Sequence, residues 1–304
     1  MASAMIRCMT ASASAPAEPF SALAAQHLPD AMAARWTGLL RPCTRLTAAT
    51  EGGTAASAVA TLGGEPLLPD GMAWPEWPGH GPLSFVASVD CAALPRAGVT
   101  ASFPDSGTLL FFYFDGQVDD AEALVFADDP ETWAGAQVLY VPAGTAVSPA
   151  PMPCELEPYE RVGLVATVDL SAQEIWHPQS RQALATEGTA SDLPHDQPAH
   201  VQTFLDALHE LRSHVGHQIG GHAIAVQNPV EYEIAHAVLG GTGVAWDDPR
   251  MDAEAQRWVL LAQFDSDDAA GMMWGDCGTL YWLIRPEDLA ARRFEAAMFT
   301  WQCC

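Results

Sequence analysis

Residues 258–285 read WVLLAQFDSDDAAGMMWGDCGTLYWLIR, and the rest of the chain is best understood from this stretch. An apolar run leads into an acidic turn, a polar loop follows, and a second apolar run begins after Gly278. Short apolar runs that are bounded by turn residues are typical of buried strands. We therefore predict two buried strands, joined by a polar connection that carries several carboxylates and Trp274.

The same pattern occurs earlier in the chain. A Gly-Gly turn, a strand that ends in aspartate, a variable connection and a strand that begins Gly-Thr-Leu recur in the same order. The matching segments are 62–67 with 219–224, 86–90 with 261–265, and 107–109 with 278–280. Repeated units bury their apolar faces against each other. The sequence thus predicts an α+β fold with an internally duplicated, mixed or antiparallel sheet unit, pseudo-two-fold symmetry and N-terminal helices.

The predicted boundaries give a single domain. Residues 1–19 are of low complexity, and we expect a disordered tail there. Residues 20–304 form the domain, with a first half at about 57–145 and a second half at about 201–304. Helices are expected at 20–28, 30–40 and 201–215, and further strands at 57–62, 82–90, 108–115, 125–127, 137–142 and 162–168. The polar composition of residues 169–200 indicates a surface excursion between the halves.

Composition limits the class of protein. Of the 304 residues, 49% are hydrophobic and 17% charged, which is typical of a globular chain with a sizeable core. Thirteen basic residues, all arginine, stand against 38 acidic ones, and the net charge is −25. Phosphate recognition depends on clustered Lys and Arg, so this charge argues against a nucleic-acid partner. It favours solubility and permits binding to a protein partner with a basic surface through electrostatic steering.

Cysteine usage and hydropathy favour the cytoplasm. The seven cysteines are scattered, odd in number and without a C-x-x-C pair, which indicates a reducing compartment rather than a disulfide framework. No apolar segment reaches the ~20 residues that span a bilayer, and the first nineteen residues lack the apolar core of a signal peptide. We expect a cytoplasmic protein without a membrane partner, and its oligomeric state is left open.

Seven motifs in a fixed order carry a resemblance to a known family. They are L-G-G-x-P-x-L-P-x-G-x-x-W-P (62–75), P-L-x-F-V-A-x-V-D (82–90), G-x-L-x-F-F (107–112), H-x-x-G-G (217–221), L-x-x-Q-x-D-S-D (260–267), W-G-D-x-G-x-L-Y (274–281) and W-Q-C (301–303). Over roughly residues 29–304 the chain resembles the YwqG-like family of bacterial proteins of unknown function. The resemblance implies an α+β fold around a duplicated sheet unit, and no activity or cofactor. Because some relatives are associated with toxin gene clusters, it also implies an immunity or accessory role.

Motifs for catalysis are poorly represented. The pair His209-Glu210 is similar to the start of the zinc-protease motif H-E-x-x-H, but His214 stands five residues after His209, about 140° further round a helix. The chain has no G-x-S-x-G nucleophile elbow. Its Gly-Gly pairs lack the third glycine and the lysine of phosphate loops. We therefore predict no catalytic residue, no metal site and no cofactor.

The remaining candidate is a polar cleft with aromatic walls. Tryptophans beside a few convergent polar groups are typical of a small-molecule or peptide groove. The candidate ligand-binding residues are Trp74, His217, Gln227, Asp265, Asp267, Trp274 and Asp276. The structural alternative is that the three aspartates bond backbone N–H groups of their own turns, and that His217 caps a turn or is partly buried.

The leading interpretation of function is non-catalytic recognition of a protein partner or a small ligand. Two alternatives stay open. One is a metal-assisted hydrolase that uses His217 with Asp265, Asp267 and Asp276, because carboxylates suit a hard cation. The other is a structural subunit of a larger assembly. A divalent cation that binds only the native state would raise the melting temperature and would favour the hydrolase.

Overall fold

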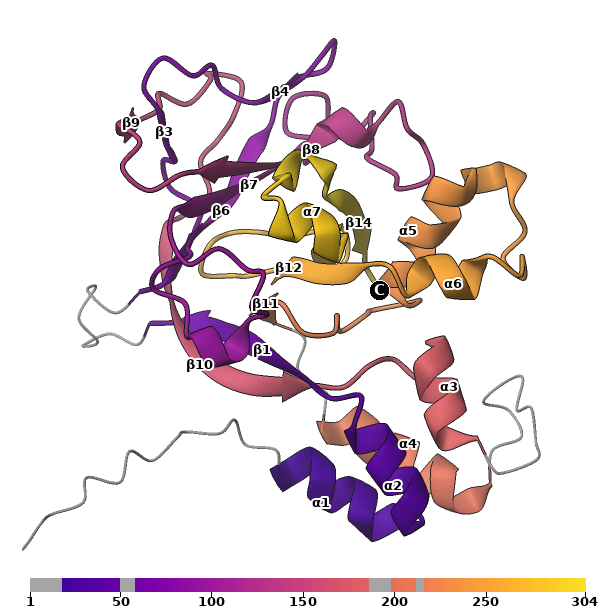
Figure 1. Ribbon diagram of the computed structural model, residues 1–304. Coiled ribbons are helices and arrows are strands. Elements are labelled where there is room, and N and C mark those ends of the chain that lie inside the picture. Colours follow the sequence, from indigo (N-terminus) through magenta and orange to yellow (C-terminus); the bar gives the residue numbers. More distant parts are fainter. Residues whose placement is uncertain (1–17, 50–57, 186–197, 212–215) are drawn as a thin grey trace, which may run out of the picture.

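The computed structural model describes residues 18–49, 58–185, 198–211 and 216–304 (Figure 1). Most of the tail predicted for residues 1–19 lies outside the described residues, and helix α1 begins at Glu18. The described part of the chain is α+β, as predicted, with seven α-helices and a large, nearly closed antiparallel sheet.

The helices and strands are as follows. The helices are α1 (Glu18–His27), α2 (Asp30–Thr37), α3 (Pro178–Leu184), α4 (Ala199–Leu211), α5 (Val230–Leu239), α6 (Met251–Ala255) and α7 (Pro286–Ala290). The main sheet contains β1 (Arg41–Ala48), β2 (Ala60–Leu62), β6 (Ser84–Asp90), β7 (Thr108–Tyr113), β8 (Ala136–Val141), β10 (Val162–Ser171), β11 (His217–Ile219), β12 (Val259–Asp265), β13 (Thr279–Ile284) and β14 (Met298–Gln302). Two small ribbons pair β3 (Leu67–Pro69) with β9 (Val147–Pro149), and β4 (Glu76–Trp77) with β5 (Gly81–Pro82).

The main sheet has the strand order β14-β13-β12-β11-β1-β10-β2-β6-β7-β8. The long strands β1 and β10 pair at its centre, and a short strand on either side leads to a meander of three strands. We call β6-β7-β8 the first meander and β12-β13-β14 the second meander. Figure 1 shows the sheet curling from β1 and β10 toward the two meanders.

The two meanders pack face to face through aromatic side chains. The ring centroid of Phe111 in β7 lies 5.0 Å from that of Phe264 in β12 and 5.1 Å from that of Trp282 in β13. The rings of Tyr113 and Phe299 are 4.9 Å apart. All five belong to one buried cluster. Tilted and edge-to-face aromatic pairs stabilise such a core beyond the area that they bury.

The meanders share details of strand register. Asp90, the last residue of β6, pairs with Thr108, and Asp265, the last residue of β12, pairs with Thr279. In both pairs the register shifts around the residue four positions before the aspartate. Both Gly-Gly pairs, which follow β2 and β11, have left-handed φ angles between 56° and 74°.

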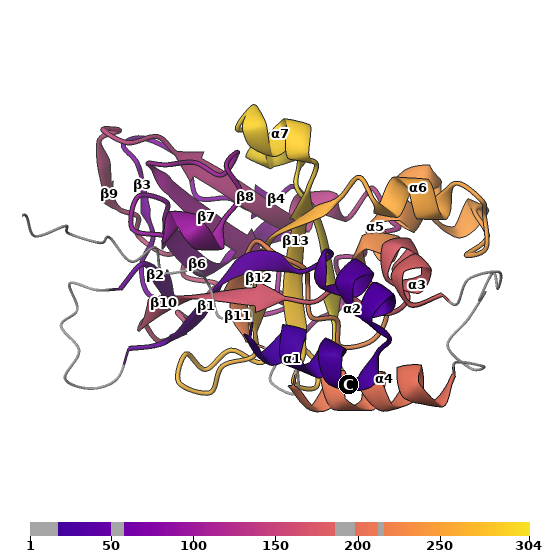
Figure 2. The same cartoon turned by 60° about the horizontal axis from the view of Figure 1, so that its bottom comes forward.

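A helical layer covers one end of the sheet. Helices α1 and α2 pack with α3 and α4 around a second buried cluster, in which the rings of Trp36 and Phe204 lie 4.8 Å apart. Figures 1 and 2 show these helices gathered beyond one end of β1 and β10, whereas α5 lies against the second meander. None of the helices in the described ranges has the length and apolar character needed to cross a bilayer.

Strand β1 was not predicted, and its pairing explains why. Pro42 follows a helical apolar pattern and suggests only the end of a helix. The strand is nevertheless paired on both sides, with β10 over eight residues and with β11 over three. Its position therefore depends on tertiary pairing rather than on a local pattern.

Two predicted elements differ from the structure. Residues 125–127 form no strand, and the carbonyl of Val125 instead accepts a hydrogen bond from the indole N–H of Trp301 at 3.1 Å. The surface excursion predicted for residues 169–200 is wrong in its first part, because Ala183 and Leu184 of α3 are buried and complete the helical cluster. Its later part, residues 186–197, lies outside the described residues.

Candidate functional site

Four of the seven predicted site residues meet at the ends of β11, β12 and β13. The Nδ1 atom of His217 accepts a hydrogen bond from the backbone N–H of Asp265 at 3.1 Å. The ring proton is therefore on Nε2, which lies 3.3 Å from Oδ2 of Asp267. The indole N–H of Trp274 donates to the carbonyl of Asp265 at 3.2 Å. Neighbouring strands of one sheet thus bring these four residues together.

The carboxylates of this cluster bond the protein itself. Oδ1 of Asp265 accepts from the Thr279 hydroxyl at 2.7 Å. Burial raises the pKa of the Asp265 carboxyl, although the hydrogen bond from Thr279 opposes this shift. Oδ1 of Asp267 accepts from the backbone N–H of Ala270 at 2.8 Å, so the prediction that Asp267 caps its own turn is confirmed.

Little of this cluster is open to a ligand. His217 is 7% exposed and Trp274 is 2% exposed, with the Trp274 ring packed edge-on against Tyr113 and Tyr159. Among the residues that the structure describes, no group of three or more His, Cys, Asp or Glu side chains is arranged to hold a metal ion. The contacts of the His217 cluster therefore fix the 266–276 loop to the sheet.

The other three predicted site residues lie apart from the His217 cluster. Trp74 packs on the outer face of the first meander, the face that points away from the second meander. The side-chain amide of Gln227 donates to the carbonyl of Cys303 at 2.5 Å. Asp276 has an exposed side chain, and its carbonyl accepts from the backbone N–H of Cys304. Within the described ranges, no hydrogen bond or ion pair joins these three side chains to the four that meet.

Two buried glutamines that the sequence analysis did not select hold an irregular segment onto the second meander. Gln263 accepts from the backbone N–H of Ile224 at 3.0 Å and donates to the carbonyl of Gly216 at 2.9 Å. Gln302 accepts from two backbone N–H groups, both at 2.9 Å, and donates to a third backbone group within residues 226–228. The sequence does mark these two positions, because each glutamine is a polar residue inside an otherwise apolar strand.

The structure contains a groove of about 460 Å³ that the sequence analysis missed. It lies between α3, the start of α5 and the loop before α6. Its lining residues are Trp176, Arg181, Asn228, Pro229, Tyr232 and Trp246. The ring of Trp246 is 58% exposed and lies parallel to that of His236, with centroids 4.1 Å apart. We call this feature the aromatic groove.

An ion pair holds the walls of the aromatic groove together. Nη2 of Arg181 in α3 lies 2.9 Å and 3.0 Å from the two carboxylate oxygens of Asp252 in α6. The hydroxyl of Tyr232 in α5 donates to the same carboxylate. Burial, and then the bond to Asp252, raises the pKa of the Tyr232 phenol. Helix α3 is thus tied to α5 and α6, which lie more than forty residues further along the chain.

His177 precedes α3 and is buried beside the groove-lining Trp176. Burial, followed by the positive charge of Arg41, lowers the pKa of its imidazole from 6.5 to about 4. Between these two values the unfolded chain binds more protons at this position than the folded chain. The stabilisation from neutral His177 is therefore complete above pH 6.5 and is lost as the pH falls toward 4.

Replacing His177 by asparagine should remove this pH dependence. We expect the unfolding free energy of the wild type to fall by up to about 3 kcal/mol more than that of His177→Asn between pH 7 and pH 4. Asparagine keeps an acceptor for the backbone N–H of Gln179, which His177 Nδ1 accepts at 3.3 Å. Urea denaturation at several pH values measures the difference, with His27→Asn as control. Parallel pH profiles for wild type and His177→Asn would contradict the prediction.

Comparison with known proteins identifies the family. The family described as Domain of unknown function (DUF1963) matches residues 60–303. The match includes both meanders, the His217 cluster and the aromatic groove. A comparison with curated proteins found no match. Because the matched residues make up most of the chain, this protein belongs to the DUF1963 family.

Proposed function

We propose that this protein is a non-catalytic recognition protein that binds a basic segment of a partner protein in the aromatic groove. The observation that carries the proposal is the pair of exposed tryptophans beside this groove, Trp246 at 58% and Trp176 at 37% exposure. Exposed aromatic side chains around a concave site are typical of protein-binding surfaces, where tryptophan and tyrosine contribute much of the affinity.

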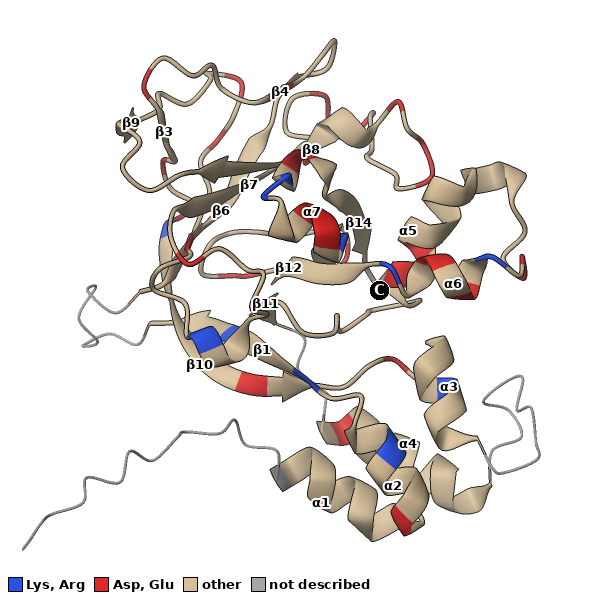
Figure 3. Ribbon diagram, viewed as in Figure 1, with Lys and Arg blue, Asp and Glu red and all other residues tan. Residues whose placement is uncertain are grey.

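Charge favours a cationic partner. The chain carries a net charge of −25, and Figure 3 shows acidic segments on α5, α6 and the loop between them. Asp247 follows Trp246, is exposed and forms no ion pair within the described residues. A cation over the face of a tryptophan gains about 0.5–1 kcal/mol at an exposed site. An arginine or lysine of the partner is therefore expected to lie on Trp246, close to Asp247.

The groove is already arranged for binding. Trp246 rests on His236, whose Nε2 lies 2.8 Å from the carbonyl oxygen of Val244. The Arg181–Asp252 pair fixes α3 against α6. Because these contacts exist before a partner arrives, little conformational entropy is lost on binding.

Replacing Trp246 by alanine removes both the cation–π contact and the apolar ring surface that a partner would bury, so it should weaken binding of a labelled arginine-rich decapeptide by at least about tenfold. Fluorescence anisotropy at low and physiological salt measures the affinity, and higher salt should weaken the wild-type interaction. Met273→Ala is the matched control, because Met273 is 52% exposed and is not a groove residue. Equal affinity of wild type and Trp246→Ala, or equal binding of a glutamate-rich decapeptide, would refute the proposal.

We extend the proposal to the subgroup of the family and to the cellular compartment of the protein. The motifs at 62–75 and 274–281 fall within the matched residues 60–303, which supports the YwqG-like assignment. An immunity or accessory role beside a toxin is the form of recognition that this resemblance implies. The six described cysteines are all free, which supports a reducing, cytoplasmic location.

The fold proposal is an internal duplication with pseudo-two-fold symmetry within one domain, residues 20–304. Its support is a strand order that reads alike from both ends, the shared Asp–Thr pairings and the shared left-handed Gly-Gly pairs. Superposing the first meander and β2 on the second meander and β11 tests it. Halves that do not superpose would count against the duplication.

A further inference from the structure

A pocket of about 250 Å³ lies on the outer face of the first meander. Strands β2, β6, β7 and β8 form its floor, and the ribbon of β3 and β9 contributes a wall. Figure 1 shows β3 and β9 on the opposite side of the molecule from α5 and α6, so this pocket is separate from the aromatic groove. Sites for drug-sized ligands measure ~300–1,000 Å³, and this pocket therefore suits a smaller molecule.

Sheet register places hydroxyl groups beside an aliphatic surface. Ser88 of β6 lies opposite Thr61 of β2 on one side and opposite Leu110 of β7 on the other. Thr108 stands two residues before Leu110, so it is on the same face, and it lies opposite Val141 of β8. The floor thus combines three hydroxyls with two aliphatic side chains.

The polar groups of this pocket have no protein partner. Within the described ranges, none of its hydroxyls forms a hydrogen bond, and its two charged side chains, Arg161 and Glu65, form neither a hydrogen bond nor an ion pair. Among the described residues, seven other arginines do pair with carboxylates. Both side chains are exposed, so water can solvate them in the free protein. A guanidinium and a carboxylate that remain open at one small pocket can receive a ligand that carries both charges.

The matching place on the second meander is filled. Gln263 stands two residues before Asp265, as Ser88 stands two residues before Asp90. Its side chain bonds the segment that covers this face, and Tyr281, which pairs with Gln263, donates to the same segment. The first meander carries a serine there, and the space that a glutamine would occupy is open.

We propose that this pocket binds an apolar α-amino acid. The carboxylate pairs with Arg161, whose guanidinium matches a carboxylate with two parallel hydrogen bonds. The ammonium group pairs with Glu65, and the side chain lies on Leu110 and Val141. The hydroxyl of Ser88 supplies a further polar contact. This site does not depend on the aromatic groove, so each proposal can fail alone.

Isothermal titration of the full chain with four probes tests the proposal. Leucine carries both charges, 4-methylpentanoate lacks the ammonium, leucinamide lacks the carboxylate, and inorganic phosphate lacks the apolar part. Leucine should bind at least about tenfold more tightly than each of the others, since a charge-assisted contact contributes about 1.5 kcal/mol or more. Phosphate that binds as tightly as leucine, or wild-type protein that binds no probe, would overturn the proposal.

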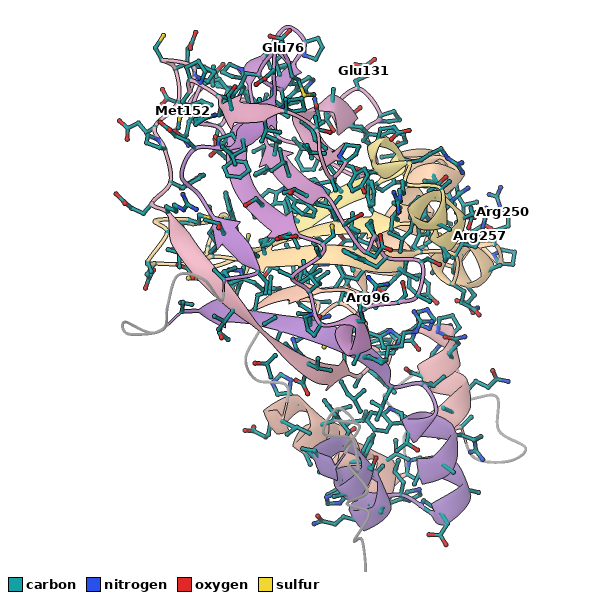
Figure 4. The ribbon with its side chains drawn as sticks, turned by 60° about the vertical axis from the view of Figure 1, so that its left-hand side comes forward. Glu76, Arg96, Glu131, Met152, Arg250 and Arg257 are labelled. Carbon is teal, nitrogen blue, oxygen red and sulfur yellow. The ribbon has the colours of Figure 1, made fainter. Side chains whose placement is uncertain are left out.

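Variants of Arg161 and Glu65 test which side chain binds which charged group of leucine. Arg161→Gln should lower the affinity for leucine by at least about tenfold. Glu65→Gln should lower the affinity for leucine to the affinity that the wild type has for 4-methylpentanoate. It should leave the affinity for 4-methylpentanoate unchanged. Arg250→Gln is the matched control, because Arg250 lies at the surface near Arg257, away from this pocket (Figure 4).

Ser88→Gln gives an independent check, because it places in the pocket the residue that fills the same position of the second meander. It should abolish leucine binding and leave the aromatic groove able to bind the arginine-rich decapeptide. Circular dichroism and the melting temperature show whether this variant is folded. Leucine binding that survives both Arg161→Gln and Ser88→Gln would refute the assignment.

Discussion

Replacing Gln302 by alanine should lower the free energy of unfolding by about 4 kcal/mol. Its side chain is 2% exposed, and its carbonyl oxygen accepts from the backbone N–H groups of Val226 and Gln227. Its amide donates to the carbonyl of Asn228 and to Glu233. Alanine removes these four part-buried hydrogen bonds and also creates a cavity. Urea denaturation, with unfolding followed by tryptophan fluorescence, measures the loss.

Two further variants separate packing from hydrogen bonding. Gln302→Leu keeps most of the side-chain volume, so it should recover the part of the loss that comes from the cavity and leave about 2–3 kcal/mol. Gln256→Ala is the matched control, because Gln256 is exposed and its amide makes a single bond, to the carbonyl of Asp252. The control should change stability by less than about 0.5 kcal/mol. A loss below about 1 kcal/mol for Gln302→Ala would show that the segment is held by other contacts.

These glutamines show why some of the fold was predictable from sequence and some was not. Apolar runs identify the three strands of the first meander and the first two of the second, whereas β14 was not predicted. Residues 108–115 and 137–142 agree closely with β7 and β8. The side chains of β7 are mostly buried, so hydrophobicity alone indicates that strand. Strand β1 carries a weaker pattern, and pairing with β10 and β11 determines its conformation. A sequence pattern cannot report a strand that depends on partners more than a hundred residues away.

The two candidate sites differ in the same respect, because the sequence predicted one of them and not the other. His217, Asp265, Asp267 and Trp274 were predicted to meet, and they do. The first three lie at or just beyond the ends of adjacent strands, and the loop between β12 and β13 brings the Trp274 indole back to the Asp265 carbonyl. The aromatic groove was not predicted. It is assembled from residues 176–181, 228–232 and 246, whose neighbourhood depends on the docking of α3 against α5 and α6. The spacing of residues along the sequence does not indicate how α3 packs against α5 and α6.

The two Gly-Gly turns give the second large expected effect. At Gly221, which has φ = 73°, an added Cβ would lie 2.4 Å from Oγ of Ser171 and 2.6 Å from Cβ of Cys43. At Gly63, with φ = 56°, it would lie 2.5 Å from the carbonyl oxygen of Glu160. Alanine at either position combines left-handed strain of about 1–2 kcal/mol with a displacement of packed neighbours. We expect Gly63→Ala and Gly221→Ala each to lower the unfolding free energy by about 3–4 kcal/mol.

The neighbouring glycines are the controls, because they share the left-handed backbone without the clash. A Cβ at Gly220 meets nothing closer than 3.8 Å, and at Gly64 it meets only the side chain of Arg161, at 3.1 Å or more. Alanine at Gly220 or Gly64 should therefore show only the backbone strain, about 1–2 kcal/mol in urea denaturation. The position that tolerates no side chain differs between the two turns. It is the first glycine, Gly63, after β2, and the second glycine, Gly221, after β11. Equal losses at all four positions would mean that backbone strain alone selects glycine here. The packing of Gly221 against β1 and β10, and of Gly63 against the residues before β10, would then contribute nothing.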